Sequence, residues 1–79
     1  MPGLEQLITP HYGLVIYAAK QMHRRLTEAG KTGVDLSELI QQGFVGLLEA
    51  GSKYDPDRNV PFAGFASPRI HGAIVDYLR

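Results

Sequence analysis

The chain has 79 residues, of which 44% are hydrophobic and 20% charged, and its eight basic residues balance eight acidic ones. This length allows one small domain, residues 1–79, with a thin core, because such a chain buries only about 60–65% of its unfolded surface. The charge balance excludes a strongly cationic nucleic-acid-binding protein, although it is compatible with a local basic patch. The chain has no cysteine, so neither disulfides nor a thiolate zinc site can stabilise it.

The apolar runs and the N-terminal residues bear on the location of the protein. No apolar run approaches the roughly 18 residues of a membrane span, so we expect no membrane partner. Residues 1–6 lack the basic and apolar regions of a signal peptide. We therefore expect a cytoplasmic protein.

The first predicted helix covers residues 10–28. Thr9 is a good N-cap, and Pro10 suits the first helical position; residues 4–7 allow a short turn before it. Apolar residues then recur three or four positions apart on one helix face: Ile8, Tyr12, Val15, Ala19, Met22 and Leu26. Gly30 and Gly33 lie in the turn that ends this helix.

The second predicted helix covers residues 36–54. Asp35 as N-cap and Glu38 at the third helical position form an Asp variant of the capping box. The same spacing of three and four predicts a core face made of Leu36, Ile40, Gly43, Leu47, Ala50 and Tyr54. Pro56 ends the helix, because proline disfavours a helical conformation in the residue before it.

The third predicted helix covers residues 61–78. Its apolar face contains Phe62, Ala66, Ile70, Ala73, Ile74 and Tyr77. Pro68 removes the hydrogen bond to the carbonyl of Gly64, so we expect a helix that is kinked there, or one that restarts with Ser67 as N-cap. No segment alternates with a period of two residues. The sequence therefore predicts an all-α fold, a small three-helix bundle.

Patterns typical of catalysis or metal binding are missing from the sequence. Residues 30–32, Gly-Lys-Thr, resemble the end of a phosphate-binding loop, but Arg25 stands where that loop needs its first glycine and a predicted helix precedes it. Asp55 and Asp57 lack the glycine and the closing glutamate of a calcium loop. No histidine pairs with a second ligand at helical spacing; the three are His11, His23 and His71. We therefore expect neither an enzyme nor a metal or cofactor.

Some apolar residues of the second predicted helix lie away from its core face. Gln41, Phe44, Val45 and Leu48 form a partly apolar stripe on the outer side. Either the stripe is a partner surface, or its members are single exposed apolar residues of the ordinary kind or lie under the third helix.

The third predicted helix has a comparable outer face. Phe65, Arg69, Gly72 and Asp76 follow one another at spacings of four, three and four, away from Phe62. An aromatic ring and an arginine beside a helix suit base stacking and phosphate contact. The alternative is a solvated face with one buried phenylalanine.

Three linked motifs stand in order within residues 12–79. Residues 35–50 read DLSELIQQGFVGLLEA, residues 53–58 read KYDPDR, and residues 61–79 read PFAGFASPRIHGAIVDYLR. These segments resemble the DL-x-DLIQ-x-G-x-x-GLL-x-A, KYDP-x-R and F-x-x-YA-x-PRIRGAI-x-D-x-LR motifs of bacterial RNA polymerase sigma factors. The resemblance is to conserved region 2 of the alternative sigma factors of flagellar, sporulation and stress type.

This resemblance implies two binding surfaces. In the family, the helix matching residues 36–53 docks on the clamp helices of the polymerase β′ subunit, and the helix matching residues 61–79 recognises and melts the promoter −10 element. With the outer stripe included, the expected polymerase-binding residues are Glu38, Gln41, Gln42, Phe44, Val45 and Leu48. The expected DNA-binding residues are Phe62, Phe65, Arg69, His71 and Arg79. Phe65 stands where the family has a Tyr or Phe that stacks on an unpaired base.

The sequence also departs from the family. Phe44 replaces a residue that is often small or polar, and residues 68–69 replace the tryptophan pair of primary sigma factors, which excludes the housekeeping type. The chain ends at Arg79, before the rest of the −10 reading segment and the domain for the −35 element, so we expect a fragment or a natural short protein. With balanced charges, we expect the isolated chain to bind −10 DNA weakly.

Two other functions stay open at this point. One is a short sigma-like regulator that occupies the clamp site without initiating transcription. The other is a helical interaction module that forms a homo-oligomer through the outer stripe. An anti-sigma factor is a further candidate partner.

Overall fold

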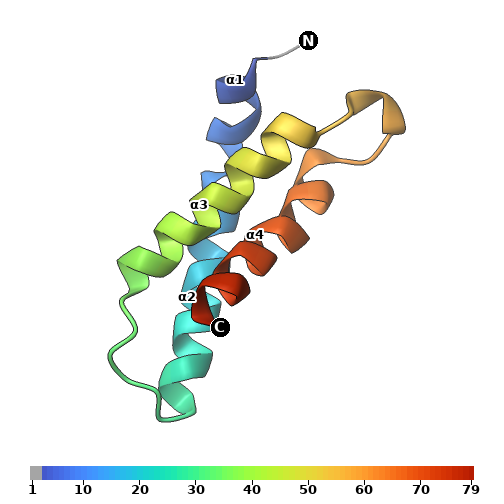
Figure 1. Ribbon diagram of the computed structural model, residues 1–79. Coiled ribbons are helices and arrows are strands. Elements are labelled where there is room, and N and C mark those ends of the chain that lie inside the picture. The colour runs from blue at the N-terminus through green and yellow to red at the C-terminus, as the bar shows by residue number, and fades with distance from the viewer. Residues whose placement is uncertain (1–2) are drawn as a thin grey trace.

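The computed structural model describes residues 3–79, which form an all-α fold (Figure 1). Its helical elements are α1 (Leu4–Ile8), the 3₁₀ turn η1 (Thr9–His11), α2 (Tyr12–Glu28), α3 (Leu36–Lys53), the 3₁₀ turn η2 (Pro56–Arg58) and α4 (Phe62–Leu78). The predicted all-α class is confirmed, and the three long helices lie within two residues of the expected ranges.

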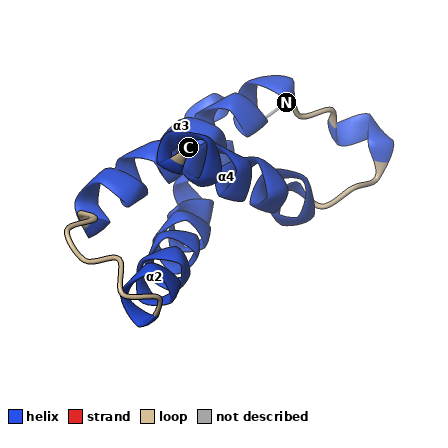
Figure 2. Ribbon diagram, turned by 60° about the horizontal axis from the view of Figure 1, so that its bottom comes forward, coloured by secondary structure: helices blue, strands red, loops and turns tan. Residues whose placement is uncertain are grey.

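The arrangement is that of a small helical bundle. α3 and α4 lie side by side and share the most extensive helix contact, while α1 and α2 pack against α3 from another side (Figure 1). The η2 segment projects at the edge of the molecule between α3 and α4 (Figure 2). Within residues 3–79, no helix combines the length and apolar character required to cross a membrane.

α1, η1 and α2 form an almost continuous helical segment, in which the predicted cap at Thr9 is wrong. Thr9 has helical backbone angles, φ −56° and ψ −45°, and no side chain caps the turn or α2. Pro10 has no N–H to continue an α-helical ladder, so the chain passes through a 3₁₀ turn and α2 begins at Tyr12. His11 Nδ1 donates a hydrogen bond to the Leu7 carbonyl at 2.8 Å, which ties this turn to α1.

The predicted N-cap of α3 is confirmed at Asp35. Its carboxylate accepts hydrogen bonds from the backbone N–H and the hydroxyl of Ser37, both at 2.9 Å. Glu38 does not complete the predicted capping box, because its carboxylate accepts a hydrogen bond from the hydroxyl of Tyr77 on α4. The start of α3 is thereby joined to the end of α4.

The core face of α3 is rotated relative to the predicted one. Leu39 and Gly46 are buried, whereas the predicted core residue Ile40 is only half-buried. The rotation brings α4 very close: a Cβ on Gly46 would lie 2.6 Å from the carbonyl oxygen of Arg69 and 2.9 Å from Cα of Ile70. The buried apolar residues are Ile8, Val15, Ala19, Leu39, Leu47, Ala50, Phe62, Ala66, Ile70 and Ile74.

α4 runs as one helix through Pro68, so of the two alternatives expected there, a kink or a restart with Ser67 as N-cap, the restart is wrong. The Ser67 hydroxyl donates to the carbonyl of Ala63 at 2.8 Å instead of capping a new helix. Pro68 and Gly64 are both exposed, so water can satisfy the carbonyl that loses its helical partner. Packing of the buried face of α4 offsets the cost of proline in a helix interior, which is about 3 kcal/mol.

Candidate functional site

The outer side of α3 carries the residues expected to bind polymerase. Three of them are exposed, namely Glu38, Gln41 and Val45. Three are half-buried, namely Gln42, Phe44 and Leu48, and the last two pack against the core. The stripe is therefore a partly apolar surface in which Val45, 45% exposed, is the exposed large hydrophobic residue.

Tyr12 of α2 extends this surface. Its ring centroid lies 5.4 Å from that of Phe44, and its side chain is 45% exposed. The sequence pattern predicts Tyr12 on the core face of its helix, and this prediction is wrong. The periodicity of one helix does not show where a second helix crosses it. We call Tyr12, Gln41, Phe44, Val45 and Leu48 the α3 surface.

A second surface lies at the C-terminal end of α3, where η2 leads into α4. It is a groove with a volume of about 360 Å³. Its lining residues, three of them basic and two aromatic, are Lys53, Tyr54, Asp55, Arg58, Val60, Phe65 and Arg69. We call it the aromatic–basic groove. Aromatic faces suit stacking with bases, and cations suit contact with phosphates.

Phe65 and Arg69 form a close pair in this groove. The guanidinium carbon of Arg69 lies 3.8 Å from the centroid of the Phe65 ring, and Arg69 Nη1 donates to the Phe65 carbonyl at 3.0 Å. The Tyr54 ring packs 5.5 Å from the same phenyl ring, at an interplanar angle of 55°. The Phe65 ring is thus in contact with a cation and with a second aromatic ring.

Phe62 supports the groove from inside the core and does not line it. It is only 6% exposed, and its ring packs edge-on against His11 at 4.9 Å and Tyr54 at 5.1 Å. In this arrangement its side chain is not accessible to nucleic acid, contrary to the expectation from the resemblance. The Tyr54 hydroxyl donates to the Val60 carbonyl, which fixes the ring that Phe62 supports.

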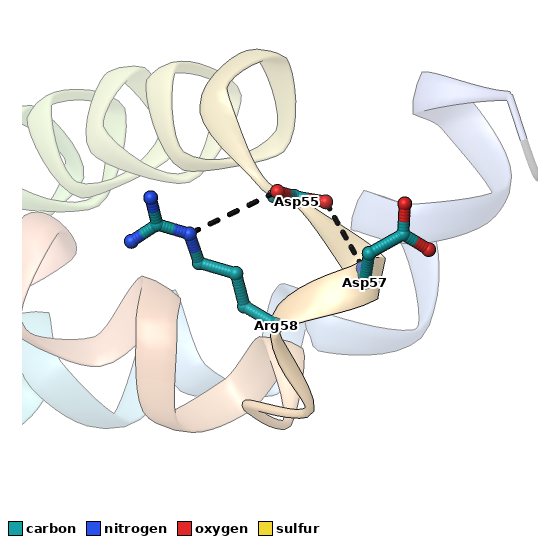
Figure 3. Close-up of polar contacts among 3 residues, drawn as sticks. All are labelled: Asp55, Asp57 and Arg58. Carbon is teal, nitrogen blue, oxygen red and sulfur yellow. Dashed lines mark hydrogen bonds and ion pairs between the residues drawn. The ribbon is translucent and has the colours of Figure 1, made fainter.

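The η2 turn positions Arg58 at the groove. The Asp55 carboxylate accepts a hydrogen bond from the Asp57 backbone N–H at 3.0 Å and lies 3.8 Å from Nε of Arg58 (Figure 3). Asn59 then takes a left-handed conformation, φ 57°, which redirects the chain toward α4. Lys53, Tyr54 and Arg58 line the groove but are not among the site residues expected from the sequence. The KYDPDR motif contains all three and could have indicated them, but its Asp-Pro step predicts only a turn.

The remaining expected DNA-binding residues lie outside this groove. His71 lines a separate groove between α2 and α4. Arg79 is exposed at the end of α4. Of the five expected residues, the structure therefore brings only Phe65 and Arg69 together.

The titration of Tyr77 is perturbed at the contact between α3 and α4. The hydrogen bond to the Glu38 carboxylate raises the pKa of Tyr77, and burial and the charges of Glu38 and Asp35 act in the same direction.

Residues 3–79 contain no group of three His, Asp or Glu side chains that could hold a metal ion.

Comparison with known proteins decides the family. The sequence model described as Sigma-70 region 2 matches residues 7–79. The chain belongs to this family. Sigma factors are transcription initiation factors and not enzymes, in agreement with the expectation from the sequence.

Three sigma factors illustrate the similarity. The chain is 39% identical over 75 residues to RNA polymerase sigma factor FliA of Pseudomonas aeruginosa, 35% over 74 residues to the sigma-D factor of Bacillus subtilis, and 34% over 73 residues to the sigma-F factor of Kitasatospora aureofaciens. The matches cover 95%, 92% and 92% of this chain, but only 29%, 24% and 22% of these relatives. No solved structure is significantly similar to the chain.

Proposed function

We propose that the chain is the region 2 module of an alternative sigma factor, acting in the cytoplasm. In this proposal it docks on the β′ clamp helices of RNA polymerase through the α3 surface, and it helps to recognise and melt the promoter −10 element through the aromatic–basic groove. The observation that carries the proposal is the groove itself, in which two aromatic rings and three cations converge from α3, η2 and α4.

The α3 surface has the composition of a protein docking site. Exposed Val45 and Tyr12 flank the half-buried Phe44 and Leu48, so a partner covers an apolar centre with little rearrangement. Interfaces of this kind derive most of their affinity from a few central apolar or aromatic residues. Glu38 at the edge of the surface favours a partner that carries basic residues.

The groove has the composition of a site for an unpaired base. A base reaches the outer face of Phe65 by displacing the Arg69 guanidinium, which costs about 0.5–1 kcal/mol at an exposed cation–π pair. Base–aromatic stacking contributes about 1–3 kcal/mol, so the exchange is favourable. The displaced guanidinium, with Lys53 and Arg58, is then available to phosphates.

These energies predict weak binding by the isolated chain. Millimolar affinity already requires about 4 kcal/mol, more than one stacked base supplies, and the ion pair with Asp55 weakens the attraction of Arg58 for phosphate. The chain as a whole carries no net charge. Docking on polymerase would supply the missing affinity by holding the groove beside the promoter.

The proposal is tested by fluorescence anisotropy with a −10 non-template strand, with and without core polymerase. We expect weak binding by the free chain and clear binding in the polymerase complex, reduced about tenfold by Phe65→Ala, in line with the stacking energy. Arg58→Gln should also weaken binding, whereas Lys31→Gln, which removes one cation from the loop before α3, should not. Submicromolar binding by the free chain would refute the charge argument, and an unchanged complex with Phe65→Ala would refute the stacking role.

A second candidate is the short regulator that occupies the clamp site without initiating transcription. The pairing of Arg58 with Asp55 favours this second candidate, because the ion pair leaves less positive charge in the aromatic–basic groove for binding DNA. In a run-off assay such a regulator would compete with a complete sigma factor, yet its own polymerase complex would not open a promoter. Light scattering of the free chain tests the third possibility, self-association through the α3 surface.

A further inference from the structure

The exposed side of α2 carries a basic cluster that the proposed function does not use. Lys20, Arg24 and Arg25 lie within six positions on one helix and are all exposed. Within residues 3–79 the one ion pair closer than 4.0 Å joins Arg58 and Asp55, so none of these three cations is paired. Cations in the last turn of a helix interact favourably with the helix dipole, which accounts for Arg25. Lys20 lies too far from the C-terminal end of α2 for this interaction.

Tyr17 adds an aromatic ring to this cluster. It is 64% exposed, the most exposed of the large hydrophobic residues in the described chain, and its hydroxyl accepts a hydrogen bond from Gln21 Nε2 at 2.7 Å. Tyr17, Lys20, Gln21 and Arg24 line one surface groove of about 310 Å³, which contains no acidic residue. We call Tyr17, Lys20, Arg24 and Arg25 the α2 basic face.

This face is close to the aromatic–basic groove across α4. Between α2 and α4 lies a further groove of about 270 Å³. Its apolar lining residues are Leu14, Tyr17, Ala18, Met22 and Ile70, and its polar ones are Gln21, Arg25, Ser67 and His71. Ser67 and Pro68 are exposed, and Arg69 on the next position belongs to the aromatic–basic groove. The two surfaces therefore use different residues of α4, and a strand that joins them has to cross this helix, whose diameter with side chains is about 10–12 Å.

We propose that the α2 basic face is a second contact for single-stranded nucleic acid, continuing the strand that enters the aromatic–basic groove. The strand crosses the exposed turn of α4 at Ser67 and Pro68, its phosphates contact Lys20, Arg24 and Arg25, and one base stacks on Tyr17. This inference rests on the proposed function, because it extends the same bound strand.

The composition of the face favours a nucleic acid over an acidic protein helix. The groove around Tyr17 is lined by one aromatic, one amide and two basic side chains, and none of them is an aliphatic residue of the kind that receives the apolar face of an amphipathic helix. One exposed ring flanked by unpaired cations is instead the combination that binds single strands without sequence preference.

The test is an NMR titration of the ¹⁵N-labelled chain with a 12-nucleotide thymidine oligomer, which detects millimolar affinities and reports each surface separately. We expect shifts of the amides of residues 17–25 as well as those of residues 65–69. Lys20→Gln/Arg24→Gln should weaken binding about tenfold at 50 mM salt. It should also lower the slope of log K against log salt by about 1.4, since each phosphate contact to a single strand contributes about 0.7.

Control variants separate this inference from a general charge effect and from the proposed function. Arg24→Gln should weaken binding more than Lys31→Gln, which removes the same charge from the loop after α2. Photo-crosslinking to an oligomer with 5-iodouracil should label Tyr17, and Tyr17→Ala should remove that label.

The other possible outcomes of the titration contradict either the α2 contact or the groove of the proposed function. Shifts in residues 65–69 without shifts in residues 17–25 would overturn this inference and leave the proposed function standing. Shifts only in residues 17–25 would refute the groove of the proposed function and, with it, the continuous strand. Equal effects of Arg24→Gln and Lys31→Gln on binding would overturn the α2 contact. It would also be overturned if no shifts appeared at millimolar oligomer, or if a polyglutamate peptide but not the oligomer shifted the amides of residues 17–25.

Discussion

The close approach of α3 and α4 at Gly46 yields a quantitative prediction. An alanine Cβ there would meet two backbone atoms, the Arg69 carbonyl oxygen at 2.6 Å and Ile70 Cα at 2.9 Å. Backbone atoms cannot rotate away, so the two helices must move apart. Such overpacking costs about 1–3 kcal/mol, and the higher helix propensity of alanine returns about 1 kcal/mol. The net loss of unfolding free energy in Gly46→Ala should be up to about 2 kcal/mol.

Thermal melts followed by circular dichroism measure this loss. For a domain of this size 1 kcal/mol shifts Tm by about 4–8 °C, so Gly46→Ala should melt up to about 15 °C below the wild type. Gly72→Ala on α4 is the matched control, because no atom lies within 4 Å of its added Cβ. It should gain about 0.5–1 kcal/mol from helix propensity and melt slightly higher. A Gly46→Ala variant as stable as Gly72→Ala would refute the close packing of α3 on α4.

Three further predictions concern the core, the α3 surface and alkaline pH. Leu39→Ala should cost about 2–5 kcal/mol of stability in urea unfolding, and Ile40→Ala clearly less; equal losses would place the core face of α3 where the sequence pattern put it. Val45→Asp should leave Tm nearly unchanged but weaken binding to polymerase by about 2 kcal/mol, or about 30-fold, in a pull-down or anisotropy competition; lost folding would show that Val45 is packed and not exposed. Because the folded state raises the pKa of Tyr77, its contribution to stability is complete below the ordinary tyrosine pKa and is lost as pH rises through the raised value. Tyr77→Phe should abolish that part of the alkaline loss, and an identical pH profile in the variant would contradict the contact with Glu38.

The local patterns in the sequence were sufficient to predict the three long helices and most of the buried core residues. The spacing of apolar residues placed three long helices, and the Asp35 cap sets the start of α3 as expected. Two local predictions failed for physical reasons that involve other parts of the chain. Thr9 continues a helical segment because residues 4–8 form a helix before it, and Pro68 remains within α4 because the buried face of that helix packs on α3.

The candidate site was less accessible to sequence reasoning because it depends on contacts between elements. Periodicity alone could not show that Gly46 allows α4 to approach, which rotates the core face from Ile40 toward Leu39. The aromatic–basic groove joins residues from position 53 to position 69 through the η2 turn. The outer pair of Phe65 and Arg69 was expected, but the participation of Tyr54 required the structure.

The guanidinium of Arg69 over Phe65 has a kinetic consequence for the proposed binding of a base. Since the ring is already covered by a side chain of the same protein, an incoming base does not meet a bare hydrophobic face but replaces an internal partner. Capture of the base is then a substitution whose speed depends on how often Arg69 swings away, and its reversal is hastened by the return of the same side chain. Shortening Arg69 to alanine would open the ring to faster entry and would remove the side chain whose return displaces the base. In the proposed function, a strand held in this way is released quickly once the promoter is open.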